Sequence, residues 1–341
     1  MISRRSFLIH SSVASFALGA GIRAPAALEP SSGQKYRAAI MGFTGQGDYG
    51  HGYERIFSGL PNVTVEAIAD PDTAGRAKAA AASGAKRQYA DFREMLAKEK
   101  PDLVSIATRC PSLHRDMAMA AIEVCRGILT EKPFTETLPD ADAVIAEAEK
   151  RKVKIAVAHN KRYAPEFIQV KSLLDEKFAG AVRMVRMQGK QDQRAGGEDL
   201  IVLGVHDFDL LRFFFSDPLW CSATVSVKGK DAETADALRG KEPITVMGDT
   251  INALFGFQNN IVASWSSVST DDDWNSRKMD VERWSFEIHG SKRIIAQQGG
   301  FMWLDSPFVV QRNDAIKWQK LPAIAEGLIP DYRKHMMKDL I

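Results

Sequence analysis

A short glycine-rich segment, residues 38–52, constrains the fold of this chain more than any other. Residues 38–41 form an apolar run, residues 42–47 a turn rich in glycine, and residues 53–57 a helical pattern. Glycine has no Cβ, so a turn of this kind between a strand and a helix lets backbone N–H groups and a helix N-terminus face a diphosphate. The segment therefore predicts a dinucleotide-binding turn.

The turn departs in one place from the dinucleotide pattern G-x-G-x-x-G. The pattern falls on Gly42, Thr44 and Gly47, so a threonine replaces the second glycine and Gly45 comes one residue late. A glycine-rich turn with a structural role would look similar. However, Asp70 closes a second apolar run about twenty residues after the turn. A carboxylate there can accept both hydroxyl hydrogens of an adenine ribose and would repel a 2′-phosphate, which predicts NAD in preference to NADP.

Residues 1–26 predict a twin-arginine signal peptide. Two consecutive arginines, Arg4 and Arg5, precede a short apolar run that contains serines, and residues 24–26 have the small-residue pattern of a cleavage site. A transmembrane anchor would need about 18 or more apolar residues. Cleavage would remove three arginines and no acid, and would change the formal net charge from +2 to −1. That balance indicates neither a nucleic-acid nor a membrane partner.

The export signal has a consequence for the cofactor. The twin-arginine machinery, the expected partner in export, moves folded proteins, and the periplasm holds no pool of nicotinamide nucleotides. A cofactor would therefore be loaded in the cytoplasm and carried out bound. The hypothesis that follows is that hydride taken from a substrate is handed back, to the same molecule or to a second one.

Between residues 36 and 160, short apolar runs alternate with stretches of helical pattern. Strands that alternate with helices at this spacing predict a doubly wound parallel sheet, with ligands at the carboxyl ends of the strands. Thr108, Lys132 and His159 each follow such a strand. We therefore expect an NAD-binding Rossmann domain over residues 36–160, after a polar linker at residues 27–35.

After residue 160 the pattern changes. A helix is predicted over residues 165–178, an alternating strand over 182–187 and an apolar helix over 203–215. Later apolar runs have no regular helices between them, so their strands should pair largely antiparallel in an open sheet. We expect these strands at residues 219–228, 244–257, 261–269, 281–289 and 293–297. Residues 161–330 thus predict a second α/β domain for substrate binding or oligomerisation. Residues 331–341 predict a C-terminal helix that stops without a cap, as a truncated element would.

The composition is that of an ordinary globular protein, with 45% hydrophobic residues. The three cysteines, Cys110, Cys125 and Cys221, do not have the spacing of a metal site, so no metal centre is predicted. We expect these cysteines to be small buried apolar residues.

A set of short motifs is spread over nearly the whole chain after the signal segment. They are the turn at residues 42–47, Asp70, Glu131-Lys132-Pro133, residues 159–163, Gly196 and Gly197 with residues 204–206 and Asp209, and residues 288–292. Together they resemble the Gfo/Idh/MocA oxidoreductase family, named for glucose-fructose oxidoreductase and inositol dehydrogenase. Glu131-Lys132-Pro133 is the most specific of them. The resemblance implies a dinucleotide domain followed by an α/β domain whose open sheet helps build the substrate site and often a dimer or tetramer interface.

The resemblance also implies that Lys132 and His206 are the catalytic residues. Oxidising a secondary alcohol removes the hydroxyl proton while hydride goes to nicotinamide C4. A lysine beside the substrate oxygen stabilises the developing alkoxide, and a histidine can serve as acid/base partner. Without the context of the motifs, the simpler interpretation would be that Lys132 is a solvated loop lysine and that His206 is a hydrogen-bonded core histidine. The implied cofactor-binding residues are Gly42, Thr44, Gly45, Gly47, Asp70, Thr108, Glu131 and Lys132.

One position departs from the family's pattern. Familiar dehydrogenases of the family have an aspartate four residues before the histidine, and here that residue is Val202. The change removes a carboxylate that would hold a sugar hydroxyl or tune the histidine. Three acids could compensate: Glu198 and Asp199 in the preceding loop, and Asp209, which shares a helical face with His206.

Other residues keep two interpretations. Arg162 and Tyr163, like Asp209, are candidate substrate contacts, with a packing, salt-bridge or other structural role as the alternative. His114 either lines the nicotinamide pocket or caps a helix. The simplest interpretation of His51 is that it belongs to the phosphate-binding turn. The acidic run at residues 271–274 could hold a cation or a sugar, or could be a solvated hairpin loop.

The sequence therefore predicts an exported, NAD-binding oxidoreductase that acts on a sugar or sugar derivative with a retained cofactor. Two alternatives remain open. One is a glycoside hydrolase or lyase that oxidises a sugar carbon transiently, so that the neighbouring C–H becomes acidic and the glycosidic bond eliminates. The other is a carbohydrate-binding protein without catalytic activity.

Overall fold

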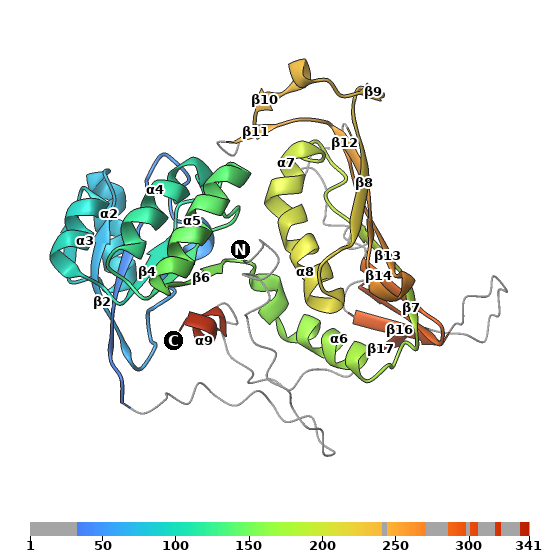
Figure 1. Ribbon diagram of the computed structural model, residues 1–341, viewed down its shortest axis with the longest axis horizontal. Helices are drawn as coiled ribbons and strands as arrows, with labels where there is room; N and C mark the ends of the chain where they lie inside the picture. Colours follow the sequence, from blue (N-terminus) through green and yellow to red (C-terminus); the bar gives the residue numbers. More distant parts are fainter. Residues whose placement is uncertain are drawn as a thin grey trace. The chain divides into compact units, whose positions relative to one another are not determined.

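The computed structural model describes the chain from residue 33 to residue 340 with gaps (Figure 1). The described residues are 33–240, 244–270, 286–297, 301–305, 318–321 and 335–340. They divide into two compact units, with the change from the first to the second after Asn160 and with the last described residues, 335–340, in the first unit. The predicted signal peptide, most of the linker and the acidic run at 271–274 lie outside the described residues.

The N-terminal unit contains a six-stranded parallel sheet, as the alternating pattern predicts. Its order is β3-β2-β1-β4-β5-β6, the order of dinucleotide-binding doubly wound domains. The strands are β1 Tyr36–Met41, β2 Val63–Ala69, β3 Arg87–Tyr89, β4 Leu103–Ile106, β5 Gly127–Thr130 and β6 Lys154–Val157. Apart from the exposed Arg37 in β1, the residues of β1, β4 and β5 are buried, which explains why these strands are apolar runs rather than alternating ones.

Four regular helices follow strands in this unit, and capping side chains mark where three of them begin. They are α2 Thr73–Ser83, α3 Phe92–Glu99, α4 Pro111–Ile122 and α5 Leu138–Arg151. Asp72 accepts a hydrogen bond from the backbone N–H of Gly75 at 2.6 Å, which confirms the predicted N-cap of α2. The short α9, Met337–Leu340, packs against β5 and β6.

The helix expected at residues 53–57 is the one N-terminal element that the prediction has wrong. A six-residue 3-10 segment, Gly50–Arg55, follows the glycine-rich turn instead. His51 and Gly52 within it have φ values of 51° and 74°, and left-handed residues interrupt helical hydrogen bonding. A regular helix N-terminus therefore does not contribute to a diphosphate site after β1.

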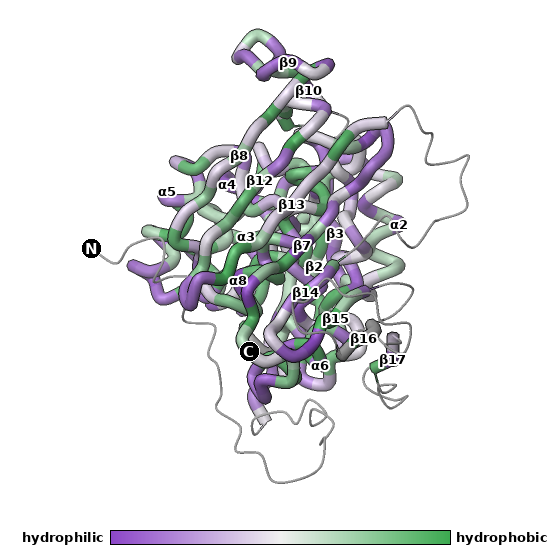
Figure 2. The backbone as a smooth tube through the Cα atoms, turned by 90° about the vertical axis from the view of Figure 1, so that its right-hand side faces the viewer, coloured by the Kyte–Doolittle hydropathy of each residue, from purple (hydrophilic) through white to green (hydrophobic). Residues whose placement is uncertain are grey.

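The C-terminal unit contains a mixed, mostly antiparallel sheet of nine strands. Its order is β17-β16-β15-β14-β7-β13-β12-β8-β9, in which only β7 and β13 pair in parallel. Figure 2 shows the strands from β8 to β16 side by side. The strands are β7 Val182–Gln188, β8 Trp220–Val227, β9 Lys230–Asp231, β12 Thr250–Gly256, β13 Val262–Val268, β14 Phe286–Gly290, β15 Arg293–Gln297, β16 Phe301–Asp305 and β17 Gln319–Lys320. The expected open, mainly antiparallel sheet is confirmed, although the predicted strand 244–257 is two strands, β11 Thr245–Val246 and β12.

Helices of the C-terminal unit pack on this sheet through aromatic side chains. The elements are α6 Pro165–Asp175, the short α7 Gly197–Asp199, a π-helical stretch at Leu200–Gly204 and α8 Val205–Phe215. Phe208 lies with its ring centroid 5.3 Å from that of Trp265 on β13, and Phe214 lies 5.8 Å from Phe286 on β14. Trp265 is almost completely buried, so these contacts fix α8 to the middle of the sheet.

The cysteines are all free, and two of the three are buried as expected. Cys110 and Cys125 pack in the N-terminal unit. Cys221 is exposed on β8, so the expectation of burial is wrong there, because β8 turns most of its side chains to solvent. Within the described ranges, no helix has both the length and the apolar character needed to cross a membrane.

A buried carboxylate ties the outer strand of the N-terminal sheet to α3. Glu99 accepts hydrogen bonds from Arg87 Nε at 2.5 Å, Tyr89 Oη at 2.5 Å and Arg37 Nη2 at 3.2 Å. The hydrogen bonds from Arg87 hold the pKa of Glu99 below its usual value. A carboxyl whose pKa is lower in the folded state contributes stability above its unfolded pKa and loses it as the pH falls.

We expect Glu99→Gln to lower the free energy of unfolding at pH 7 by about 1–3 kcal/mol, because the arginines lose a charged acceptor. The difference from the unsubstituted protein should shrink between pH 7 and pH 3 as the native carboxylate is protonated. Urea unfolding at both pH values measures this. Glu94→Gln on the same helix, at a half-exposed ion pair with Lys98, is the control and should change stability by less than about 0.5 kcal/mol. Equal effects of the two substitutions would contradict the assignment.

Candidate functional site

The glycine-rich turn is held at the carboxyl end of β4 by hydrogen bonds. Thr108 Oγ1 donates to the carbonyl of Gln46 at 2.5 Å, and the backbone N–H of Arg109 donates to the carbonyl of Gly47 at 3.2 Å. Gly47 has a φ of 82°, and a Cβ there would lie 2.5 Å from the backbone nitrogen of Cys110. Glycine is therefore required at position 47, both for the backbone angle and for the close approach to the next loop.

Asp70 lies at the carboxyl end of β2, is fully buried and faces the turn. Its carboxylate accepts hydrogen bonds from Thr44 Oγ1 at 2.7 Å, from the backbone N–H of Thr44 at 3.0 Å and from that of Asp72 at 2.9 Å. The threonine at the second glycine position thus supplies a hydroxyl for Asp70. A ribose that binds to this carboxylate has to replace the Thr44 hydrogen bonds.

Tyr49 also belongs to this turn, and the sequence reasoning missed its role. A Cβ added to Gly42 would lie 2.2 Å from the Tyr49 ring, so the ring packs directly on the glycine at the end of β1. Burial, together with the negative charge of Asp70, raises the pKa of the Tyr49 phenol. The spacing of the glycines gives no indication that an aromatic residue packs next to Asp70.

The Glu-Lys-Pro motif follows β5 and is buried. The backbone N–H of Lys132 donates to Glu131 Oε2 at 2.5 Å, and His51 Nδ1 is hydrogen-bonded to Glu131 Oε1. Glu131 is fully buried, and Lys132 is 5% exposed. The peptide bond between Lys132 and Pro133 is cis. His51, expected in the phosphate turn, therefore connects that turn to the motif.

His114 joins the loop after β4 to the loop after β5. Its Nε2 lies 2.8 Å from the carbonyl oxygen of Thr108, and its Nδ1 lies 2.9 Å from that of Pro133. Burial lowers the pKa of this imidazole. His114 lies within α4 and not at its start, so it ties the two loops together instead of capping the helix. The structure thus brings Thr108, Glu131 and Lys132 together at one edge of the sheet.

These residues fit a dinucleotide. Gly45 has a φ of 83° and no heavy atom within 4 Å of the place where a Cβ would be, which leaves its backbone open. The turn, the Asp70 carboxylate and the buried Lys132 follow the carboxyl ends of β1, β2 and β5, at the edge of the parallel sheet where doubly wound sheets bind ligands. The glycine turn could hold the diphosphate of a dinucleotide, and Asp70 could hold its ribose. Glu131 and Lys132 could hold the reacting end of the same dinucleotide.

The C-terminal unit carries His206 on α8, directly after the π-helical stretch that contains Val202. His206 is 7% exposed. Asp207 accepts hydrogen bonds from Lys161 Nζ at 2.8 Å and from Trp265 Nε1 at 3.1 Å. π-Helical turns occur frequently at functional sites. The segment before His206 is therefore irregular, where the sequence predicted one continuous helix from residue 203.

Two of the predicted substrate residues contact each other. Arg162 donates to both carboxylate oxygens of Asp209, with Nε 2.7 Å from Oδ2. This bidentate ion pair is the salt-bridge alternative that the sequence left open for Arg162. Tyr163, the third predicted substrate residue, is partly exposed next to it.

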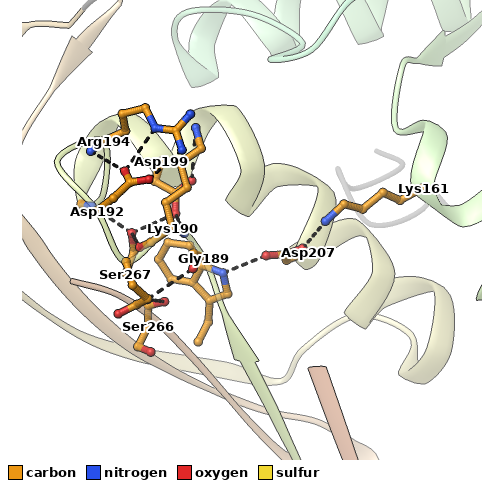
Figure 3. A network of polar contacts seen from close by, with 12 residues as sticks. Lys161, Gly189, Lys190, Asp192, Arg194, Asp199, Asp207, Ser266 and Ser267 are labelled. Atoms are coloured by element: carbon orange, nitrogen blue, oxygen red, sulfur yellow. Dashed lines mark hydrogen bonds and ion pairs between the residues drawn. The ribbon is translucent and has the colours of Figure 1, made fainter. Parts of the chain in front are cut away.

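A further polar cluster surrounds Asp199 (Figure 3). Asp199 Oδ2 accepts hydrogen bonds from the backbone N–H of Lys190 at 2.6 Å and from Ser267 Oγ at 2.8 Å. A Cβ on Gly189 would lie 2.1 Å from Asp199 Oδ2, so glycine is needed for this approach. Sequence reasoning named Asp199 as a compensating acid and missed Lys190. No motif marks the nine-residue separation of these two, and Ser267 comes from β13, far along the chain.

The sheet order, the glycine turn and the acid after β2 define a dinucleotide-binding Rossmann domain joined to a second α/β domain. The chain belongs to the Gfo/Idh/MocA family. Residues 36–159 match its oxidoreductase family domain with an NAD-binding Rossmann fold, and residues 167–296 match the GFO/IDH/MocA C-terminal domain. The family predicted from the motifs is thus confirmed.

Among characterised relatives, the chain is 29% identical over 216 residues to D-apiose dehydrogenase of Paraburkholderia graminis, which covers 59% of this chain. It is 27% identical over 198 residues to inositol 2-dehydrogenase of Rhizobium meliloti, which covers 55% of this chain. The chain spans 56% of the length of the first relative and 58% of the second.

Solved structures share the fold. Levoglucosan dehydrogenase in complex with NADH and L-sorbose superposes with a TM-score of 0.67 at 19% identity, over 89% of this chain and 87% of the other. An oxidoreductase from Agrobacterium radiobacter in complex with NAD+, L-tartaric acid and magnesium superposes with a TM-score of 0.65 at 18% identity, over 90% of this chain and 86% of the other. At this identity the likeness shows the fold alone.

Two glycines of the turn offer a matched test of its geometry. Gly47→Ala should place a Cβ against the backbone of Cys110. At Gly45 the Cβ of an alanine meets open space, so the only cost is the left-handed backbone conformation, a conformational free energy of about 1–2 kcal/mol. We expect Gly47→Ala to reduce NADH affinity, measured by fluorescence titration, at least about tenfold more than Gly45→Ala, since the turn has to move. Equal affinities of the two variants would show that contact of Gly47 with the β4 loop does not shape the site.

Proposed function

We propose that this protein is an NAD-dependent oxidoreductase that interconverts a secondary alcohol and a ketone on a sugar or polyol. The observation that carries the proposal is the buried Glu131-Lys132 pair at the carboxyl end of β5, beside the glycine turn and Asp70. Family membership supports NAD chemistry. The relatives D-apiose dehydrogenase and inositol 2-dehydrogenase support the substrate class.

The chemistry assigns a role to each residue. NAD, when bound, supplies an acceptor for hydride. Lys132 stabilises the negative charge that develops on the substrate oxygen as its proton leaves, because an ammonium in a buried site interacts strongly with an alkoxide. Glu131, which bonds to the backbone of Lys132 and to His51, holds the lysine in its loop. His206 serves as acid/base group in the second domain.

Asp70 supports a preference for NAD over NADP. Its carboxylate is fully buried and already accepts three hydrogen bonds, so a 2′-phosphate at this place would meet an unscreened negative charge. A ribose hydroxyl can replace the Thr44 hydroxyl as donor without a change in charge. Arg76, whose guanidinium donates to the backbone carbonyl of Asp70 at 2.5 Å, is directed to the peptide and not to the carboxylate.

Export and cofactor retention are part of the proposal. The twin arginines at the start of the chain direct the folded protein to the periplasm with NAD bound. The bound cofactor then returns the hydride to the same substrate molecule or to a second one. Val202, where the family's dehydrogenases carry an aspartate, favours a second candidate. In that reaction a sugar carbon is oxidised, a glycosidic bond eliminates, and the carbon is reduced again, so nicotinamide shows no net change.

The proposal is tested first on the protein purified from its export compartment. Denaturation should release about one NAD or NADH per chain, and myo-inositol, D-apiose or levoglucosan should reduce the bound cofactor. Glycoside cleavage without net reduction of nicotinamide would favour the second candidate. Absence of any dinucleotide together with sugar binding would indicate a carbohydrate-binding protein without catalysis.

Two substitutions test the catalytic assignments. Lys132→Met and His206→Asn should each lower the rate of hydride transfer by about 10²–10⁴-fold, because each removes a proton-transfer or charge-stabilising group. The dissociation constant of NADH should remain within about threefold in His206→Asn, since this change removes none of the residues expected to bind the cofactor. Lys78→Met, at an exposed position on α2, is the control. Rates that match the control would remove the assignment.

The cofactor preference is tested by Asp70→Asn. Asparagine keeps an acceptor for Thr44 and removes the negative charge, so affinity for NADP should rise relative to NAD by at least about tenfold. Competitive titration of NADH and NADPH fluorescence measures the ratio. Thr44→Val serves as control, because it alters the hydrogen bond and leaves the charge in place. An unchanged ratio in Asp70→Asn would contradict the role given to the carboxylate.

A further inference from the structure

Lys190 has an unusual environment two residues after the end of β7. Its side chain is 10% exposed, and its ammonium contacts Asp199 Oδ1 at 3.8 Å, beyond the length of a hydrogen bond. Among the residues that the structure describes, none accepts a hydrogen bond from Lys190 Nζ. A lysine ammonium has three N–H donors, so the Lys190 ammonium can donate hydrogen bonds to a ligand.

Asp199 holds this lysine without satisfying it. Its Oδ2 is bound by the backbone N–H of Lys190 and by Ser267 Oγ, while its Oδ1 accepts no hydrogen bond. Burial raises the pKa of the Asp199 carboxyl and lowers the pKa of the Lys190 ammonium. The pair is thus oriented by the backbone, and the charge of each member is only partly compensated by the other.

The surrounding charges define the class of ligand. Asp192 and Arg194, beside Lys190, neutralise each other through two hydrogen bonds of 3.1 and 2.7 Å. Glu198 adds one more negative charge near the ammonium. A carboxylate or phosphate would therefore meet more acids than bases, whereas an uncharged oxygen can accept from Lys190 without repulsion.

We propose that Lys190 is a specificity-determining residue of the substrate domain, whose ammonium donates a hydrogen bond to an uncharged oxygen of a bound sugar or polyol. Asp199 is its positioning residue. The inference deepens the proposed function and rests on it for the class of substrate. Figure 3 shows Lys190 with Asp199 of α7 and Ser267 of β13, the strand whose Trp265 donates a hydrogen bond to Asp207 of α8.

The test measures binding as well as turnover. Calorimetric titration with myo-inositol, D-apiose, levoglucosan and D-gluconate identifies the probe that binds the unsubstituted holoprotein most tightly. Lys190→Met should weaken binding of a neutral probe at least about tenfold, raise KM by the same factor and change kcat by less than about threefold, because a charged hydrogen bond to ligand is lost. Lys230→Met, at an exposed lysine of the same domain, should change none of these.

A double variant separates ligand binding from folding. Lys190→Met alone leaves the Asp199 charge buried without a partner, whereas Lys190→Met with Asp199→Asn removes both charges. The double variant should fold with native thermal stability and still bind the neutral probe at least about tenfold more weakly. Recovery of binding in the double variant would show that the pair is only structural and would overturn the inference.

The outcomes also separate this inference from the proposed function. If the neutral probe binds and Lys190→Met weakens it, but no cofactor reduction occurs, the oxidoreductase proposal fails and the binding role of Lys190 stands. If turnover is observed and Lys190→Met behaves like Lys230→Met, the inference fails and the proposed function stands. Tightest binding of D-gluconate, lost in Lys190→Met, would overturn the assignment of an uncharged ligand oxygen.

Discussion

The N-terminal site depends on hydrogen bonds that hold the glycine-rich turn against the ends of β2 and β4. Thr44 joins the turn to Asp70, and Thr108 joins it to the loop after β4. His51 extends the same chain of contacts to Glu131 after β5. Because these partners come from strands that are neighbours in the parallel sheet, the strand order itself determines which side chains can meet at the carboxyl edge.

The sequence predicts this domain well where burial determines the pattern. The apolar runs of β1, β4 and β5 are buried on both faces, and Asp72 marks the start of α2. The prediction fails after the turn, where a helical pattern at residues 53–57 is overridden by left-handed residues at His51 and Gly52. It also could not find the partners of Asp70 or Glu131, since contacts between distant residues leave no periodic signal.

In the C-terminal unit, three acids of the segment that carries His206 each meet a different cation. Asp199 faces Lys190, Asp207 binds Lys161, and Asp209 binds Arg162. The sequence analysis considered two of them, Asp199 and Asp209, as substitutes for one missing carboxylate. Asp207 and Asp209 are each bound by one cation, whereas the charge of Asp199 is only partly compensated by Lys190. These contacts attach the segment both to the residues after β7 and to the residues that follow the N-terminal domain.

This arrangement bears on the consequence of Val202. A carboxylate four residues before His206 would lie one turn away on a regular helix, but here residues 200–204 are π-helical and carry no acid. Asp199 lies seven residues before His206, and its carboxylate is held through Oδ2 by Ser267 and the backbone of Lys190. Asp209 is held by both arms of Arg162. In the proposed function, Lys132 and His206 therefore carry the acid/base chemistry without a third carboxylate, and the hydrogen bond proposed for Lys190 would help to orient the substrate.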